Sequence, residues 1–181
     1  SRVQNTVSYP ASFMLVASMN PCPCGNYGSR TKQCTCTQTM IQKYLSKISG
    51  PMLDRIDLQV EVDSVSYSDL TDTGFAESSE SVRARVQAAR RIQEERFAGT
   101  GIHCNAQMTG EMIKRYCSLD ETCAKLIKQA FDSLNMSARG YNRILKVART
   151  VADIRKSENI QKEHLLLAIS FRYLDRKYWS R

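Results

Sequence analysis

The hydrophobic positions in the first third of the chain follow three short patterns. Residues 13–19 form a nearly continuous apolar run, which is typical of a strand buried on both faces of a sheet. Between Thr37 and Ile48 the apolar residues recur at helical spacing, with Thr37 as a cap and Gly50-Pro51 as a stop. Residues 56–62 alternate between apolar and polar positions, as a half-buried strand does. The pattern therefore predicts strand, helix and strand.

The pattern changes at a segment rich in Ser, Asp and Thr. Residues 63–76 have no apolar period and are predicted to be a linker. Beyond it, apolar residues recur every three or four positions, and we expect helices over residues 79–97, 109–117, 118–134, 137–154 and 160–171. Because each apolar stripe is too narrow to be buried alone, residues 77–181 are expected to pack into an all-α helical bundle.

The N-terminal pattern is too small to be a complete α/β domain. Two strands and one helix cannot cover both faces of a sheet, so residues 1–62 are expected to be the end of a larger α/β core. The sequence has no Gly-Lys dipeptide and therefore no Gly-x-x-x-x-Gly-Lys-Ser/Thr phosphate loop. It also has no signal segment and no apolar run near the roughly 20 residues that span a bilayer. We expect a cytoplasmic chain without a membrane partner that is part of a longer protein.

The overall composition indicates little about function, but the distribution of charge along the chain is uneven. The chain has 181 residues, 42% hydrophobic and 24% charged, as an ordinary folded protein does. Residues 1–75 are neutral in sum, so residues 76–181 carry the whole net charge of +8, including Arg83, Arg85, Arg90, Arg91 and the tail 172–181. Basic excess attracts nucleic acid and other polyanions, but solvated helix faces account for the same charge.

Four of the seven cysteines lie in the turn-rich segment after the first apolar run. Cys22 and Cys24 form one Cys-x-Cys pair, and Cys34 and Cys36 form another. Four thiolates in a short loop can hold Zn²⁺ tetrahedrally, although this spacing is tighter than the common Cys-x-x-Cys. Free or redox-sensitive thiols are the alternative, since a cytoplasmic setting disfavours disulfides.

The other cysteines and the two histidines show no such spacing. Cys117 and Cys123 fit small core positions in the helical half. His164 is expected to pack in the last helix, and neither it nor His103 is assigned to a metal. Cys104 is also unrelated to the cluster.

Three long motifs carry a family resemblance. They are residues 13–25 (Phe-Met-Leu-Val-Ala-Ser-Met-Asn-Pro-Cys-Pro-Cys-Gly), residues 48–62 around Leu53-Asp54-Arg55, and residues 137–154, which begin Ser-Ala-Arg-Gly-Tyr-Asn-Arg. Through them the chain closely resembles the bacterial magnesium-chelatase-like AAA+ ATPases, in particular the ComM/YifB subgroup. The resemblance implies ATP and Mg²⁺ as ligands of the full-length protein, with the phosphate loop upstream. This part alone is then expected to be inactive.

The same resemblance implies three catalytic roles. Asn20 matches sensor 1, where an amide orients the attacking water or contacts the γ-phosphate. Without the resemblance, the dipeptide Asn20-Pro21 fits the start of a turn equally well. Arg55 matches the arginine finger offered to a neighbouring subunit, although its sequence also fits a surface pair with an adjacent Asp. Arg139 matches sensor 2, the lid residue that reaches the γ-phosphate of its own subunit.

Nearby basic residues could be mistaken for sensor 2. Arg143, Lys146 and Arg149 follow Arg139 on the same predicted helix, and as a group they are expected to be solvated. With Asn20 and Arg55 on the core and Arg139 on the lid, bound nucleotide would set the angle between two domains, with residues 63–76 as the hinge.

The resemblance implies a ring-shaped motor, hexameric by analogy, that remodels DNA by branch migration or helicase action, as ComM-like proteins are associated with competence. A chelatase-like ATPase acting on a protein or a metal-insertion client is the alternative. A third hypothesis, from a different class, is that this part of the protein is a non-enzymatic helical interaction module.

Overall fold

The computed structural model describes residues 7–9, 13–29, 31–62, 65, 67, 71, 74, 76–174 and 178. Its contacts divide the chain into two compact units, Ser1–Tyr44 and Leu45–Arg181. Residues 45–62, expected to belong with the N-terminal core, thus group with the helical residues instead. Most of the predicted linker 63–76 lies outside the described residues.

The helix predicted in the first third forms, but it is shorter than expected. α1 spans Gln38–Leu45, and the Thr37 hydroxyl accepts a hydrogen bond from the Met40 amide at 3.3 Å, which confirms the predicted cap. Gly50-Pro51 does not only stop a helix, because a second short helix, α2, begins there and spans Gly50–Leu53. Proline is compatible with the first turn of a helix, where its missing N–H has no partner to lose.

Neither predicted strand forms, and no β-strand is present among the described residues. Residues 13–19 are irregular and exposed, and Phe13, Met14 and Val16 are 76, 82 and 86% exposed. Residues 56–62 are also irregular, with Val60 and Val62 exposed. A strand is stabilised by a neighbouring strand, and no described segment of this chain supplies one.

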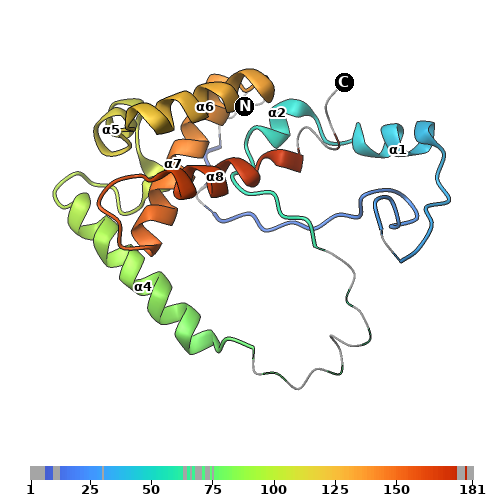
Figure 1. Ribbon diagram of the computed structural model, residues 1–181, viewed down its shortest axis with the longest axis horizontal. Helices are drawn as coiled ribbons and strands as arrows, with labels where there is room; N and C mark the ends of the chain where they lie inside the picture. The colour runs from blue at the N-terminus through green and yellow to red at the C-terminus, as the bar shows by residue number, and fades with distance from the viewer. Residues whose placement is uncertain are drawn as a thin grey trace. The chain divides into compact units, whose positions relative to one another are not determined.

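The second unit is a helical bundle built around one long helix (Figure 1). Helix α7 contacts α4, α5, α8 and the 3₁₀ turn η1, while α6 packs on α8. The bounds are α4 Ser79–Arg96, η1 Asn105–Gln107, α5 Gly110–Tyr116, α6 Glu121–Ser133, α7 Ala138–Ile154 and α8 Lys162–Ser170. The predicted all-α bundle is therefore present in the described part of residues 77–181.

Side-chain caps begin most of these helices. The hydroxyls of Ser78, Thr109 and Ser137 accept hydrogen bonds from the amides of Ser81, Met112 and Gly140 at the starts of α4, α5 and α7. Helix α6 begins later than predicted, because the cap is Asp120, whose carboxylate accepts from the Cys123 amide at 2.7 Å. That bond lowers the pKa of Asp120.

One hydrophobic core joins the helices. Phe97, at the end of α4, is 1% exposed and meets the Tyr116 ring edge-on at a centroid distance of 5.5 Å. Cys117 and Cys123 are buried in this core, as predicted, and burial raises the pKa of each thiol to about 11. His164 is buried too, as expected for the last helix.

A buried ionic network, centred on Asp153, ties α7 to α4 and η1. The Asp153 carboxylate is bonded by Arg96 from α4 and by Arg149 one turn earlier in α7, and Asn105 donates to it at 2.8 Å. Arg149 also donates to the carbonyls of Ser157 and Glu158 beyond α7. The expectation that Arg149 is solvated is therefore wrong. Its buried guanidinium is tolerated because its donors meet the Asp153 carboxylate and two backbone carbonyls.

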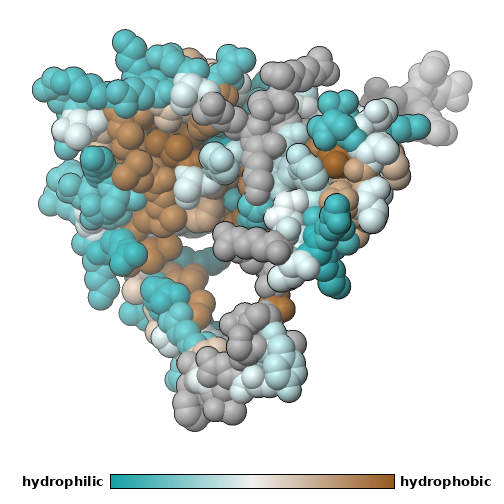
Figure 2. Space-filling model, turned by 45° about the vertical axis from the view of Figure 1, so that its right-hand side comes forward, coloured by the Kyte–Doolittle hydropathy of each residue, from teal (hydrophilic) through white to brown (hydrophobic). Residues whose placement is uncertain are grey.

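The bundle does not bury all of its apolar surface. Hydrophobic side chains remain visible between hydrophilic ones in the space-filling view (Figure 2). Phe131, Leu166 and Leu167 are 37, 46 and 41% exposed. Within the described residues, no helix is both long enough and apolar enough to cross a bilayer.

Candidate functional site

The first unit contains a tight turn that gathers cysteines. In Cys22-Pro23-Cys24-Gly25 the Gly25 amide donates to the Cys22 carbonyl at 3.0 Å, which closes a β-turn. Gly25 has a φ of +79°, a conformation in which glycine carries no Cβ penalty. Proline supplies the fixed φ that such a turn favours. The turn points two thiols to the same side.

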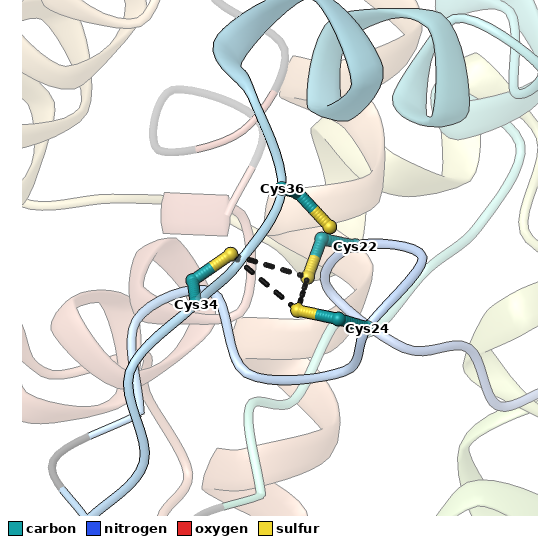
Figure 3. A group of neighbouring side chains, drawn as sticks. All are labelled: Cys22, Cys24, Cys34 and Cys36. Carbon is teal, nitrogen blue, oxygen red and sulfur yellow. Dashed lines mark hydrogen bonds between the residues drawn. The ribbon is translucent and has the colours of Figure 1, made fainter.

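The four predicted cysteines do come together (Figure 3). The Sγ atoms of Cys22, Cys24 and Cys34 lie 3.4, 3.5 and 3.7 Å apart in pairs. With Cys36 included, all four sulfurs lie within 4.8 Å of one another. A tetrahedral Zn²⁺ site with Zn–S bonds of about 2.3 Å requires S···S edges of about 3.8 Å. The donor set and its spacing therefore fit one zinc ion.

The thiols of the cluster do not have equal acidity. Backbone hydrogen bonds from Asn26 and Thr35 lower the pKa of Cys24 to about 5. Desolvation raises the pKa of Cys36 to about 12. Thiolates packed this closely repel one another, so without a cation the cluster favours one thiolate beside neutral thiols. A divalent cation removes that repulsion.

Asn20 lies directly before the cysteine turn. A Cβ added at Gly25 would lie 3.8 Å from Cγ of Asn20, so the turn packs against this amide. Asn20 is exposed and ends an irregular segment, whereas the sequence placed it at the end of a buried strand. Asn20 and the cysteines belong to the first unit, and Arg55 and Arg139 belong to the second.

The turn after α2 carries Arg55 on its surface. Leu53 is buried, and Arg55 is exposed, with its guanidinium donating to the Pro51 carbonyl at 2.7 Å. The alternative for Arg55, a surface pair with a neighbouring aspartate, is not formed among the described residues. Asp54 and Asp57 bind other arginines instead.

Two arginines from the bundle hold this turn. Arg172, just beyond α8, is buried and donates to the carbonyls of Leu53 at 3.2 Å and Ile56 at 2.7 Å. Arg143 of α7 donates to the Arg55 carbonyl at 2.7 Å and forms an ion pair with Asp57. Arg143 is thus not simply solvated, and Arg172, which the sequence placed in the basic tail, is buried.

The start of α7 meets the same turn. The Ser137 hydroxyl donates to an Asp54 carboxylate oxygen at 3.1 Å while it accepts from the Gly140 amide. Arg139 lies in the first turn of α7 and is exposed. The structure therefore brings the elements that carry Arg55 and Arg139 together in one unit. Arg143, Arg172 and Ser137 fasten the turn to the bundle.

Sequence reasoning missed Arg172 and the burial of Arg149, although a signal was present. Arg172 follows Leu165 by seven residues and Ala168 by four, and both of these are buried. Arg149 lies four residues after Leu145, which is also buried. An arginine in register with an apolar stripe is expected to face the core side of its helix.

Comparison with known protein families places both parts of the chain. Residues 76–172 match the family described as magnesium chelatase, subunit ChlI C-terminal. Residues 1–70 match the family described as magnesium chelatase, subunit ChlI. The two matches follow one another along the chain, as they would in one protein of this type.

Individual relatives agree with this assignment. The chain is 40% identical over 177 residues to the uncharacterized protein YifB of Escherichia coli strain K12 and to the competence protein ComM of Haemophilus influenzae. It is 32% identical over 172 residues to an uncharacterized protein of Mycobacterium tuberculosis. These alignments cover 95–97% of this chain but 34% of each relative, so the chain spans about a third of their length. The chain therefore belongs to the magnesium-chelatase-like family of AAA+ ATPases.

Proposed function

We propose that this chain supplies three polar residues to the ATP-hydrolysis site of an AAA+ motor. Asn20 acts as sensor 1, Arg55 as an arginine finger and Arg139 as sensor 2. The observation that carries the proposal is the pairing of the Arg55 turn with the first turn of α7 through Asp54 and Ser137. Both arginines remain exposed there, and an exposed guanidinium is available to a phosphate.

The chemistry assigns each residue a distinct task. Phosphoryl transfer develops charge on the equatorial oxygens of the transferred group, which Mg²⁺, when bound, neutralises in part. Arg55 adds a forked, permanently charged donor, which matches that charge better than lysine would. Asn20 offers a neutral amide that can orient water without adding charge, and Arg139 contacts the nucleotide from the lid.

We propose that the two irregular apolar segments become strands of the AAA+ core in the full-length protein. Residues 13–19 present large apolar side chains to solvent, an arrangement that is costly without a partner surface. Pairing in a sheet would bury them and would place Asn20 at a strand end. This arrangement gives the predicted end of the α/β sheet.

DNA is the client that we propose for the motor. The net positive charge lies in residues 76–181, and Arg83, Arg90 and Arg91 are exposed on α4. The first half of α4, which carries Arg83, is exposed on all sides, and Arg90 and Arg91 are exposed in the second half, so all three can meet a polyanion. The relative ComM is named a competence protein, which is consistent with a DNA client. By analogy with other AAA+ motors, we propose that the protein assembles as a hexameric ring.

Two alternatives differ in the client or in the class of protein. A chelatase-like motor would act on a protein or a metal-insertion client, as the family description suggests. A non-enzymatic interaction module would use the exposed apolar surface instead. Binding to forked DNA that weakens steeply with salt favours the DNA motor, and salt-insensitive or absent binding favours the alternatives.

We propose a structural Zn²⁺ ion held by Cys22, Cys24, Cys34 and Cys36. The close packing of the four sulfurs supports it, and the ion would crosslink the segment from the cysteine turn to the start of α1. Metal analysis of the purified protein should give one zinc per chain. A finding of no zinc with four freely alkylatable thiols would remove this proposal.

The finger assignment is tested by Arg55→Ala in the full-length protein. We expect ATP turnover to fall by about 10³-fold or more, as for other arginine fingers, with nucleotide binding retained. Arg155→Ala is the matched control, because Arg155 is an exposed arginine on the far end of α7. Undiminished turnover in Arg55→Ala would disprove the assignment.

A further inference from the structure

The turn that carries Arg55 is attached to the bundle at every residue around it. Arg172 binds the carbonyls on both sides of it, at Leu53 and Ile56, and Arg143 binds the carbonyl of Arg55 itself. Three residues after Ile56, the Gln59 amide donates to the Phe171 carbonyl at 3.1 Å. The backbone of the turn is thus fixed by donors and acceptors that come from α7 and from the end of α8.

Arg172 is suited to hold a backbone rather than to bind a ligand. Its guanidinium donates to two carbonyls and reaches the Asp54 carboxylate at 3.3 Å, and its side chain is 5% exposed. Burial of a charge is costly unless its donors are satisfied, and here the turn supplies those acceptors. The turn and Arg172 therefore stabilise each other's position.

Arg143 and Ser137 complete the attachment from α7. Arg143 bridges the Arg55 carbonyl and Asp57, so it fixes the backbone from which the Arg55 side chain projects. Ser137 caps α7 and binds Asp54, so the first turn of α7 and the Arg55 turn share one polar contact. Arg139 lies two residues from that contact, and Arg55 lies one residue from it.

We propose that Arg143 and Arg172 are positioning residues that make the Arg55 turn move as one body with helix α7. This inference rests on the proposed role of Arg55 in hydrolysis. It adds that a movement of the Arg139-bearing helix end carries Arg55 with it, because the polar contacts leave the turn no independent position. A finger must be placed within a fraction of an ångström of the developing charge, so loosening the turn lowers the rate of hydrolysis.

The expected signature is a loss of turnover without a loss of nucleotide affinity. In the full-length protein, Arg143→Ala should lower kcat for ATP by about 10- to 100-fold, the scale of a small misplacement, and leave KM nearly unchanged. Arg143→Lys should recover part of the rate, because a single ammonium can serve the carbonyl or Asp57 but cannot match the fork. Arg155→Ala is the matched control and should leave kcat unchanged.

A double-mutant cycle distinguishes positioning from general stabilisation. Arg143→Ala should have no further effect on kcat when Arg55 is already alanine, because it acts only through that side chain. An equal loss in both backgrounds would overturn the inference. Full turnover in the single variant Arg55→Ala would disprove the proposed function itself. The two failures are therefore distinguishable, because the single variant tests the proposed function and the cycle tests the positioning role.

Amide hydrogen exchange gives a second measurement that does not depend on catalysis. Exchange at residues 53–57 should speed up in Arg143→Ala and in Arg172→Met, which keeps the aliphatic volume but removes the hydrogen bonds. Exchange within α7 should stay slow, which shows that the bundle is folded. Faster exchange with undiminished kcat would overturn the positioning role, and unchanged exchange would show that the attachment is not formed in solution.

Discussion

The two units of this chain are stabilised in different ways. Within the described part of Ser1–Tyr44, only Cys22 and Ile41 are buried apolar residues. In Leu45–Arg181 a continuous core is lined by Phe97, Ile144 and Leu165, together with a buried ionic network. Hydrophobic burial and this network stabilise the second unit, whereas we expect the first unit to depend on what its four thiols and its exposed apolar segment bind.

The difference between the two units determines how firmly each candidate functional residue is held in position. Arg55 and Arg139 project from elements that side chains of the bundle hold at defined distances. Asn20 projects from an irregular segment whose nearest support is the cysteine turn. We expect metal at the cysteines, and a sheet around residues 13–19, to hold Asn20 in position as firmly as the bundle holds Arg55 and Arg139.

Removing the metal should destabilise the chain more than any other change proposed here, and the loss should be confined to the first unit. Structural zinc sites contribute apparent binding energies on the order of 10 kcal/mol, so a strong chelator or Cys22→Ser should release the proposed zinc and speed amide exchange at residues 22–37. Exchange in α7 should not change. Cys104→Ser, outside the cluster, is the control and should keep one zinc per chain.

The next effect tests the ionic network of the second unit. Asp153→Ala leaves the guanidinium groups of Arg96 and Arg149 without their carboxylate, and we expect it to lower the free energy of unfolding by about 3–5 kcal/mol. Denaturant unfolding of the helical signal measures this. Asp132→Ala, at an exposed position of α6, should change it little, and an equal loss in both variants would argue against a special role for the network.

A smaller effect is expected at the cap of α7. Ser137→Ala removes the acceptor for the Gly140 amide and the donor to Asp54, and should cost about 1 kcal/mol of unfolding free energy. Ser78→Ala removes the equivalent cap of α4 without a second contact. If the two variants lose the same stability and exchange equally at residues 53–57, the contact of Ser137 with Asp54 contributes nothing.

The smallest effect concerns pH and His164. Desolvation lowers the pKa of His164, whose Nδ1 accepts from the Gln161 amide at 3.0 Å and so requires the neutral ring. The unfolded chain therefore takes up the proton first, and stability falls as pH drops below the unfolded value of about 6.5. Denaturant midpoints between pH 7.5 and pH 5.5 should show this loss, and His164→Gln should reduce it.

Local sequence patterns predicted the helices and their starts well. The predicted starts of α4, α5 and α7 lie within one residue of the observed ones. The hydroxyls of Ser78, Thr109 and Ser137 cap these helices, and such a cap depends only on an amide three residues away. The helix predicted over residues 118–134 begins later, at Glu121, because Asp120 rather than Ser118 is the cap, and both residue types are common at that position.

The candidate site was predictable in its residues and not in its arrangement. The four cysteines were grouped correctly from spacing, since a turn of four residues brings Cys22 and Cys24 together. The link between Asp54 and Ser137 joins residues 83 positions apart, and the pairing of Arg172 with Leu53 spans 119. No short-range pattern specifies contacts of that kind.

The sequence by itself determined the helices, the cysteine cluster and the family to which the chain belongs, because each depends on residue types at short, fixed spacings. Tertiary structure decided that Arg149 and Arg172 are buried, that residues 13–19 and 56–62 form no strand here, and that Arg55 joins the helical unit. The physical reason is that a strand needs a partner and a buried arginine needs acceptors. Both are supplied only by segments distant in the sequence.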